Sequence, residues 1–224
     1  MKCEACQNDF FKNWDLTTFI FNQIKYDSVI CFECQEQFIK IGPNYCFGCG
    51  KYQTMSDMCI DCMSWMRKGQ TLLQNRALYR YSQMMKWFFR EYKFKGGYHL
   101  RTIFLGELET LIEAERMIVI IPIAANKLKQ RGFNQTKGLL QDQTHGSNLL
   151  RCKQSFQTTQ SQKSREQRIH TPQWFELNVD RSEVKGQMIT LIDDIYTTGR
   201  TLYHAADCLY VAGAKNVNSI TLVR

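Results

Sequence analysis

Continuous hydrophobic runs of strand length alternate with amphipathic segments in the C-terminal half of the chain. The runs "MIVIIPI" (117–123) and "QMITLID" (187–193) are apolar along most of their length rather than at alternate positions. Such continuity is typical of strands that are buried on both faces, as in a parallel sheet. "TLYHAADCLYVAGA" (201–214) predicts a helix that Gly213 ends, and "NVNSITLV" (216–223) predicts a final strand. The order strand–helix–strand therefore predicts an α/β fold with a mainly parallel sheet flanked by helices.

Residues 65–115 have a helical periodicity instead. Hydrophobic pairs at 84–85 and 88–89 recur at helix spacing, and Ser82 is a candidate N-cap. Gly96-Gly97 interrupts the pattern, and a second helix is expected at about Leu100–Ala114. Residues 131–141 are expected to form a loop that enters a helix. Residues 142–170 are rich in polar side chains and predict a mobile loop with one short strand or helix.

Four C-x-x-C pairs lie within the first 62 residues. They are Cys3/Cys6, Cys31/Cys34, Cys46/Cys49 and Cys59/Cys62. Each pair forms a knuckle that aims two thiolates at one tetrahedral centre, and two knuckles complete a structural zinc site. Four pairs therefore predict two structural Zn²⁺ ions with no coordination position left for water. Disulfides or free buried cysteines are the alternative, which a reducing compartment disfavours.

Sequence proximity favours pairing the first knuckle with the second and the third with the fourth. The crossed arrangement, first with third and second with fourth, stays open. A short helix capped by Asp15 or Thr17 is expected between the first two knuckles. Cys152 and Cys208 stand alone, and Cys208 is expected in the core. The chain is thus divided into a zinc-binding module at 1–65 and a second domain at 66–224.

Composition excludes some classes of protein. No apolar run reaches the length of about 18 residues that a transmembrane helix needs, so no stable membrane insertion is expected. The N-terminus lacks the basic-then-apolar pattern of a signal peptide, which makes a cytoplasmic protein the default.

The formal charge of +8 is unevenly distributed. Residues 1–62 carry five Lys/Arg and eight Asp/Glu, a net charge of −3. Residues 63–101 carry nine Lys/Arg and one Glu, a net charge of +8, and residues 127–168 carry nine Lys/Arg and two acids, a net charge of +7. Clustered positive charge makes phosphates or nucleic acid plausible partners.

Cations and aromatic side chains interleave between residues 76 and 101. Single-strand binders combine cations that follow the nucleic-acid backbone with aromatic rings on which bases stack. The alternative is that the aromatic side chains pack in the core and the cations form a solvated face. The candidate nucleic-acid contacts are Arg80, Lys86, Arg90, Lys93, Lys95 and Arg101.

The stretch "LIDDIYTTGRT" (191–201) carries the most specific chemistry. Asp193 and Asp194 end an apolar strand, and a loop of small polar residues leads into the next helix. Ligands of parallel sheets bind beyond the carboxyl ends of the strands, and loop amides before a helix can hold a phosphate. The two carboxylates can accept hydrogen bonds from vicinal hydroxyls. Together these features describe a site for a ribose 5-phosphate group, whose phosphate contacts are Thr197, Thr198, Gly199, Arg200 and Thr201.

This stretch resembles the signature of type I phosphoribosyltransferases, with one extra residue before Thr198-Gly199. The resemblance implies a ligand such as phosphoribosyl pyrophosphate with Mg²⁺, and a mobile hood at residues 151–168. It also implies a pyrophosphate loop at residues 123–126 and nearby cations, with the contacts Ala124, Ala125, Lys127 and Arg131. The transition state that it implies is oxocarbenium-like and needs no covalent nucleophile, so catalysis would come from electrostatics and positioning, and the catalytic residues stay unknown.

Over nearly its full length the chain resembles the ComF family of competence proteins. The resemblance is carried by the cysteine pairs, "YKFKGG" (92–97), "IPIAANKLKQRGFNQ" (121–135), "QSQKSREQR" (160–168) and "LIDDIYTTGRT". It implies a zinc finger fused to a phosphoribosyltransferase-like fold and a role in natural transformation. Single-stranded DNA, a competence helicase and recombination proteins are the partners that it implies.

Three functions stay open at this stage. The first is a competence protein that binds phosphoribosyl pyrophosphate and single-stranded DNA. The second is an active phosphoribosyltransferase with an unidentified acceptor. The third is a non-enzymatic zinc and DNA adaptor.

Overall fold

The structure, a computed structural model, describes residues 1–11, 29–67, 69–141, 146–153 and 173–224. The helix expected after Asp15 or Thr17 lies outside these residues. So do residues 142–145 and 154–172, which hold most of the loop expected at 142–170 and of the hood expected at 151–168.

A four-stranded parallel sheet forms the centre of the molecule. Its strands are β1 (Asn75–Tyr79), β2 (Met117–Ile120), β5 (Met188–Ile195) and β6 (Asn216–Val223), in the order β1-β6-β5-β2. Every neighbouring pair is parallel, which confirms the predicted sheet. A separate antiparallel pair, β3 (Leu150–Cys152) and β4 (Phe175–Leu177), lies beside it. The two long strands β5 and β6 are central, as their continuous burial requires.

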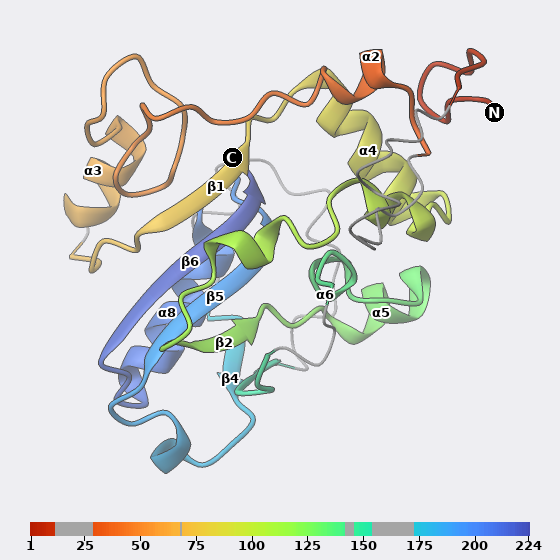
Figure 1. The fold of residues 1–224 in the computed structure, drawn as a ribbon. Helices are drawn as coiled ribbons and strands as arrows, with labels where there is room; N and C mark the ends of the chain where they lie inside the picture. The colour runs from red at the N-terminus through yellow and green to blue at the C-terminus, as the bar shows by residue number, and fades with distance from the viewer. Residues whose placement is uncertain (12–28, 68, 142–145, 154–172) are drawn as a thin grey trace.

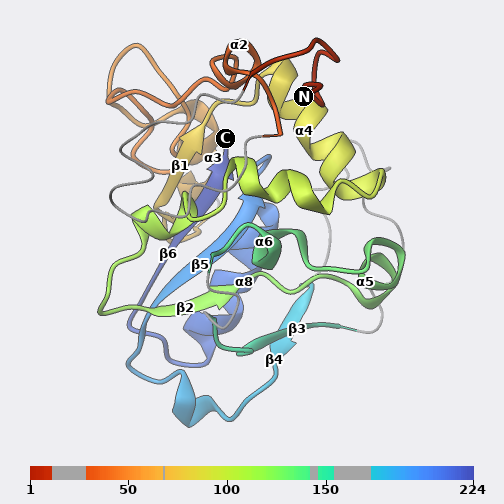
Figure 2. The same ribbon diagram turned by 45° about the vertical axis from the view of Figure 1, so that its right-hand side comes forward.

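Helices cover both faces of this sheet (Figures 1 and 2). Helix α8 (Arg200–Val211) packs on one face against Ile189 and Leu191. Helix α4 (Gln83–Phe94) belongs to the cluster on the other face, with Ile192 and Ile220. Successive β5 side chains point to opposite faces, so this single strand contributes to both hydrophobic cores.

Helix α4 follows the predicted pattern closely. The Ser82 hydroxyl accepts a hydrogen bond from the Met85 N–H at 3.1 Å and caps the N-terminus. The buried face repeats at helix spacing, with Met85, Phe88, Phe89 and Tyr92. The helix ends at Phe94, and Gly96 follows with φ +74°, a conformation that favours glycine.

Two expectations for residues 65–115 are wrong. Residues 75–79 form the edge strand β1 instead of helix, because backbone pairing with β6 overrides a weak local preference. The helix expected at Leu100–Ala114 is replaced by two 3₁₀ helices, η1 (Tyr98–Ile103) and η2 (Leu108–Leu111). Gly106, with φ +83°, separates them and stops a continuous helix.

The remaining helices of the described residues are short. They are α2 (Phe32–Gln35), α3 (Ile60–Arg67), α5 (Ala125–Arg131), α6 (Gln135–Gly138) and the 3₁₀ helix η5 (Arg181–Glu183). Helix α3 continues across residue 65, where the boundary between the two domains is predicted.

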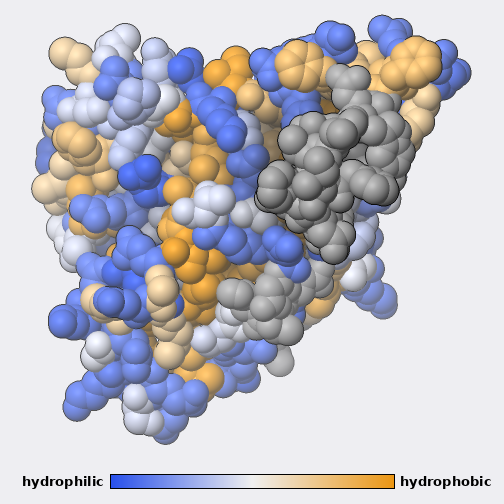
Figure 3. Space-filling view, viewed as in Figure 1, coloured by the Kyte–Doolittle hydropathy of each residue, from blue (hydrophilic) through white to orange (hydrophobic). Residues whose placement is uncertain are grey.

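Hydrophilic side chains surround the margin of the face seen in Figure 3, and hydrophobic ones gather toward its middle. Within the described ranges, no helix is both long and apolar enough to span a membrane.

Candidate ligand pocket and metal centres

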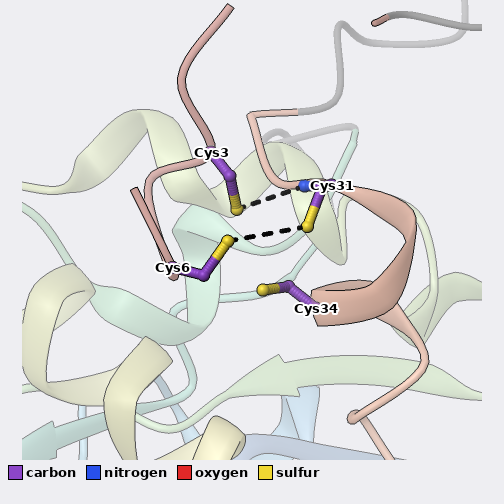
Figure 4. Close-up of side chains that lie close together, drawn as sticks. All are labelled: Cys3, Cys6, Cys31 and Cys34. Atoms are coloured by element: carbon purple, nitrogen blue, oxygen red, sulfur yellow. Dashed lines mark hydrogen bonds between the residues drawn. The ribbon is translucent and has the colours of Figure 1, made fainter. Parts of the chain in front are cut away.

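The eight cysteines of the four knuckles form two groups of four. Cys3, Cys6, Cys31 and Cys34 make the first cluster (Figure 4), and Cys46, Cys49, Cys59 and Cys62 make the second. The sulfur atoms within each cluster lie within 4.8 Å of one another. This grouping confirms the pairing of the first knuckle with the second and of the third with the fourth, and the crossed arrangement is wrong.

The sulfur–sulfur distances fit a tetrahedral metal site. Contacts of 3.8 Å join Cys6 to Cys31 and of 3.7 Å join Cys46 to Cys62. Four thiolates at the usual zinc–sulfur distance stand about 3.8 Å apart, whereas a disulfide needs about 2.05 Å. All ten cysteines are free thiols in the structure, which removes the disulfide alternative. The donor set therefore fits Zn²⁺.

Backbone geometry supports the same interpretation. The Cys31 N–H donates to the Cys3 sulfur at 3.2 Å, and the Cys59 N–H donates to the Cys46 sulfur at 3.2 Å. Such bonds stabilise a sulfur that carries negative charge. A Cβ on Gly48 would lie 2.6 Å from the Cys62 sulfur, so the third knuckle closes only with glycine there.

Asp193 and Asp194 are buried near the carboxyl end of β5, as the sequence indicated. The Asp193 carboxylate accepts from the Asp194 N–H at 2.9 Å and from the Thr136 hydroxyl at 3.4 Å. Burial, and then the charge of Asp194, raises the pKa of Asp193 to about 8. Asp194 forms an ion pair with the ammonium of Lys93, a residue of α4.

The two carboxyl groups open into a cavity of about 240 Å³. Three cations, Lys93, Lys127 and Arg131, line it together with these two acids. Burial lowers the pKa of Lys127, and the nearby charges of Arg131 and Lys93 lower it further. Crowded cations that outnumber the acids make this cavity suited to an anionic ligand.

The motif "RGFNQ" builds one wall of the cavity. Helix α5 ends at Arg131, Gly132 follows with φ +81°, and the Asn134 side chain caps α6. The Asn134 amide also donates to the Ile121 carbonyl at 3.1 Å, which ties this turn to the end of β2. The Arg131 guanidinium donates to the Gln135 side chain at 2.8 Å, so both lining residues hold each other in place.

The predicted phosphate loop begins directly after β5. Thr197 and Thr201 line the cavity, and Gly199 is the N-cap of α8 with φ +79°. A Cβ on Gly199 would lie 2.2 Å from the Tyr196 hydroxyl, so the close approach also requires glycine. The Arg200 guanidinium lies over the Trp65 ring at 5.6 Å.

Of the remaining predicted phosphate and pyrophosphate contacts, one lines the cavity and the others do not. Ala124 lines the cavity and is the N-cap residue of α5. Ala125 begins α5 and is not among the lining residues, and neither are Thr198, Gly199 and Arg200.

The six candidate nucleic-acid cations divide into two groups. Lys86 and Arg90 on α4 and Lys95, its C-cap residue, are exposed, and Arg90 and Lys95 form ion pairs with Glu91 at 3.0 and 3.3 Å. The other three make intramolecular contacts. Arg80 stacks on the Tyr52 ring at 3.3 Å, Arg101 donates to the Gly138 carbonyl at 3.0 Å, and Lys93 lines the cavity.

Half of the eight interleaved aromatic side chains belong to the core. Tyr79, Phe88, Phe89 and Tyr92 are buried, whereas Tyr81, Phe94 and Tyr98 are exposed. For the buried four, core packing is therefore the correct interpretation.

Sequence reasoning missed several lining residues or gave them another role, among them Lys93, Gln135, Cys152, Trp174 and Phe175. Lys93 and Gln135 lie in quoted motifs, so the motifs were the available signal. No pattern around Cys152 or Trp174 marks them, because β3 and β4 meet the pocket only in the folded chain.

Comparison with known proteins identifies relatives over most of the chain. Residues 151–224 match the profile described as the phosphoribosyl transferase domain. The competence protein ComFC of Streptococcus pneumoniae (strain ATCC BAA-255 / R6) is 36% identical over 201 residues, which covers 88% of this chain and 89% of the relative. The competence protein ComFC of Bacillus subtilis (strain 168) is 32% identical over 233 residues, covering 99% and 94%. Competence protein F of Haemophilus influenzae (strain ATCC 51907 / DSM 11121 / KW20 / Rd) is 22% identical over 211 residues, covering 87% and 90%.

Proposed function

The chain belongs to the ComFC family of competence proteins, and from this premise we propose that it acts in natural transformation. In this proposal it binds phosphoribosyl pyrophosphate in the pocket beyond β5 and handles incoming single-stranded DNA. It works in the cytoplasm beside a competence helicase and recombination proteins. The role in competence follows from the family; the ligand, the DNA and the partners are the proposed part.

One observation carries the ligand assignment. A single cavity is lined by the Asp193-Asp194 pair, by the loop that enters α8, and by three cations. A vicinal diol, a monophosphate and a pyrophosphate are the groups that these three features accommodate. Phosphoribosyl pyrophosphate carries all three on one ribose.

The residues of the chain have separate roles in this assignment. The Asp193 and Asp194 carboxylates accept from the ribose hydroxyls, and the loop Thr197–Thr201 donates to the 5-phosphate. Lys127 and Arg131, both on α5, neutralise the pyrophosphate. Lys93, which pairs with Asp194, supplies a further cation next to the two carboxylates. Mg²⁺, which prefers oxygen ligands, would be held mostly by ligand oxygens and water and would supply further positive charge.

The decisive experiment is calorimetric titration of the reduced, zinc-loaded protein with phosphoribosyl pyrophosphate and Mg²⁺. We expect saturable binding by the unaltered chain and at least a hundredfold weaker binding after Asp193→Asn with Asp194→Asn, because two charge-assisted hydrogen bonds are lost. Unchanged affinity of the double variant would refute this assignment of the site.

A matched control keeps the result interpretable. Asp180→Asn with Glu183→Gln removes the same two charges from the exposed turn at η5. Circular dichroism of both double variants reports whether the fold is retained. Binding by the control and by the unaltered chain, with loss only in the Asp193/Asp194 variant, supports the proposal.

We further propose that each cysteine cluster holds one Zn²⁺ with a structural role. The four thiolate ligands leave no open position for water or substrate, and their spacing fits the tetrahedral ion. Metal analysis of protein purified under reducing conditions without chelator should give about two zinc ions per chain, one for each four-thiolate site. A content near zero would contradict both sites.

A further inference from the structure

The second cysteine cluster packs directly against the body that carries the ligand pocket. Its last knuckle, Cys59/Cys62, leads into helix α3, and Trp65 follows Cys62 by three residues on that helix. Positions three apart lie on one helical face, so the metal ligand and the tryptophan face the same neighbour. Both belong to the hydrophobic core that contains α8.

Trp65 contacts the candidate phosphate loop. Its indole N–H donates to the Thr198 carbonyl at 3.2 Å, and its ring stacks on Tyr203 of α8 with centroids 4.4 Å apart. The Tyr203 hydroxyl accepts from the Leu73 N–H at 3.3 Å, which fixes the ring under the tryptophan. Only 8% of the Trp65 surface is exposed, so packing holds this side chain in place. Through its hydrogen bond to Thr198, it restricts the movement of the loop.

Arg224 makes the adjacent contact. Its guanidinium donates to the Thr197 carbonyl at 3.0 Å and pairs with Asp61 of α3 at 3.7 Å. The guanidinium also interacts with the sulfur of Cys49. A zinc ion with four thiolates carries a net charge of about −2, which suits a buried guanidinium beside it.

These two contacts orient the donors that a phosphate needs. In a trans peptide the carbonyl and the next N–H point in opposite directions. Holding the carbonyls of Thr197 and Thr198 therefore fixes the N–H groups of Thr198 and Gly199. In the described part of the chain, neither N–H has an acceptor.

The cluster is also fixed to the sheet. The Asn75 N–H donates to the Gly48 carbonyl at 2.7 Å, and the Asn75 side chain donates to the Cys49 carbonyl at 3.1 Å. Asn75 is buried at the start of β1. The third knuckle is therefore anchored to the sheet, while the fourth holds the loop through α3.

We propose that the second cysteine cluster, with its zinc, is a positioning element for the phosphate loop, acting through Trp65 and Arg224. This inference rests on the proposed ligand of the pocket. The first cluster serves as the natural comparison, because Cys3, Cys31 and Cys34 pack in the other core, with α4.

The first test is Trp65→Phe, which keeps an aromatic ring and deletes the indole N–H. We expect about fivefold to tenfold weaker binding of ribose 5-phosphate, and pyrophosphate affinity unchanged within about twofold, since one hydrogen bond at the phosphate loop is lost. A general loss of folding would weaken both ligands alike. Trp87→Phe on α4 is the matched control and should leave both affinities unchanged.

The second test does not depend on a ligand. Amide hydrogen exchange of residues 196–201 should become faster in Trp65→Phe and in Arg224→Lys, which cannot reproduce the forked guanidinium contacts. Cys59→Ser should lower the zinc content by one and speed the same exchange. Cys6→Ser should lower the zinc content by one and leave the loop unchanged.

The outcomes separate this inference from the proposed function. If the unaltered protein binds neither ribose 5-phosphate nor phosphoribosyl pyrophosphate, the proposed function fails and loop exchange alone decides the inference. Unchanged exchange of residues 196–201 in Trp65→Phe and Cys59→Ser overturns it. Where the unaltered protein binds, equal ribose 5-phosphate affinity in Trp65→Phe overturns it as well.

Discussion

Asp193 and Asp194 lie side by side in sequence but have different environments. Asp193 is held by a backbone N–H and the Thr136 hydroxyl, and its pKa is raised because burial and its neighbour's charge disfavour ionisation. Asp194 is paired with Lys93. The pair therefore combines one carboxyl group that readily holds a proton with one that has its own counter-ion. Ligand hydroxyls and Mg²⁺ would compete with that proton and that lysine.

His204 is a second buried titratable residue near the pocket. Its Nδ1 accepts a hydrogen bond from the backbone N–H of Trp174 at 3.2 Å. Trp174 lines the cavity, and the centroids of the Trp174 and His204 rings lie 5.0 Å apart. Burial, and then the charges of Arg200 and Lys153, lowers the pKa of His204 to about 4. Neutral His204 therefore stabilises the fold fully above its unfolded pKa near 6.5, and this contribution is lost as pH falls toward 4.

His204→Gln should remove this pH dependence. Glutamine can accept from the Trp174 N–H but does not titrate, so the variant should lose on the order of 2 kcal/mol less stability between pH 7 and 4.5 than the unaltered chain. Thermal unfolding of both proteins across that pH range measures the difference. Both proteins release zinc in acid, so this effect cancels when their stabilities are compared. Parallel curves would contradict the assignment.

At this scale, motifs predicted residues whose chemistry is local. The Asp193-Asp194 pair and the threonine-rich loop were found because a strand, two acids and a helix start lie next to one another in the chain. Lys93 was assigned to nucleic acid because other cations lie near it in the sequence. No sequence pattern around Lys93 indicates its ion pair with Asp194, about a hundred residues away. Only the folded chain shows that Lys93 and Lys95, two positions apart on α4, have different surroundings.

Among the elements, α6 is the clearest case of a segment shaped by its neighbours. Its four residues have little helical stability of their own. Asn134 caps the N-terminus, and the Tyr92 hydroxyl of α4 donates to the Gln135 carbonyl at 2.8 Å. A Cβ on Gly138 would lie 2.3 Å from that hydroxyl, so the contact between α4 and α6 requires glycine.

Gly138→Ala should therefore destabilise the protein by about 1 to 3 kcal/mol, the usual cost of overpacking a buried site. Because α6 supplies Gln135 to the pocket and the Thr136 hydroxyl to Asp193, ligand affinity should fall as well. Gly42→Ala is the control, since a Cβ there meets nothing within 4 Å. Urea unfolding of both variants measures the effect, and equal stabilities would refute the contact.

Helices and strands were predicted correctly where the apolar residues follow a clear pattern, and wrongly where they do not. The runs that became β2, β5 and β6 are apolar enough to need two covered faces, and α4 has a cap and a regular stripe. β1 has no such signal, because "NRALY" gains its structure from pairing with β6. Residues 98–111 have a helical spacing of apolar side chains that 3₁₀ turns also satisfy, and the effect of Gly106 was not anticipated.

For the whole molecule, the charge distribution is the property that bears on nucleic acid. The exposed Lys86 and Arg90 lie on helix α4 and Lys95 is its C-cap residue, while Lys93 of the same helix lines the ligand pocket. Lys86, Arg90 and Lys93 follow one another at spacings of four and three residues, which places them on one side of the helix. A strand of DNA that follows these cations would therefore pass close to the proposed ligand.

Lys86→Gln, Arg90→Gln and Lys95→Gln together should weaken binding of single-stranded DNA. The loss of three phosphate contacts should reduce the slope of log affinity against log salt by about 2, because single strands release about 0.7 counterion per contact. Fluorescence anisotropy of a labelled oligonucleotide across salt concentrations measures both quantities. Lys51→Gln, Lys185→Gln and Lys215→Gln make the same change in net charge at exposed positions elsewhere. An equal loss in the two sets would contradict a local binding surface.

The order of strands in the sheet has a consequence for how the chain reaches its fold. β5 and β6 occupy the centre of the sheet, yet they are the last strands in the sequence. β1 pairs with β6 through residues such as Asn75 and Ser219, and every such pairing must close a very long loop. During synthesis β1 and β2 emerge early and wait as unpaired edges until β5 and β6 appear. Slow, late folding from non-local contacts is therefore expected, with chaperone protection of the nascent chain most useful before the final strand emerges.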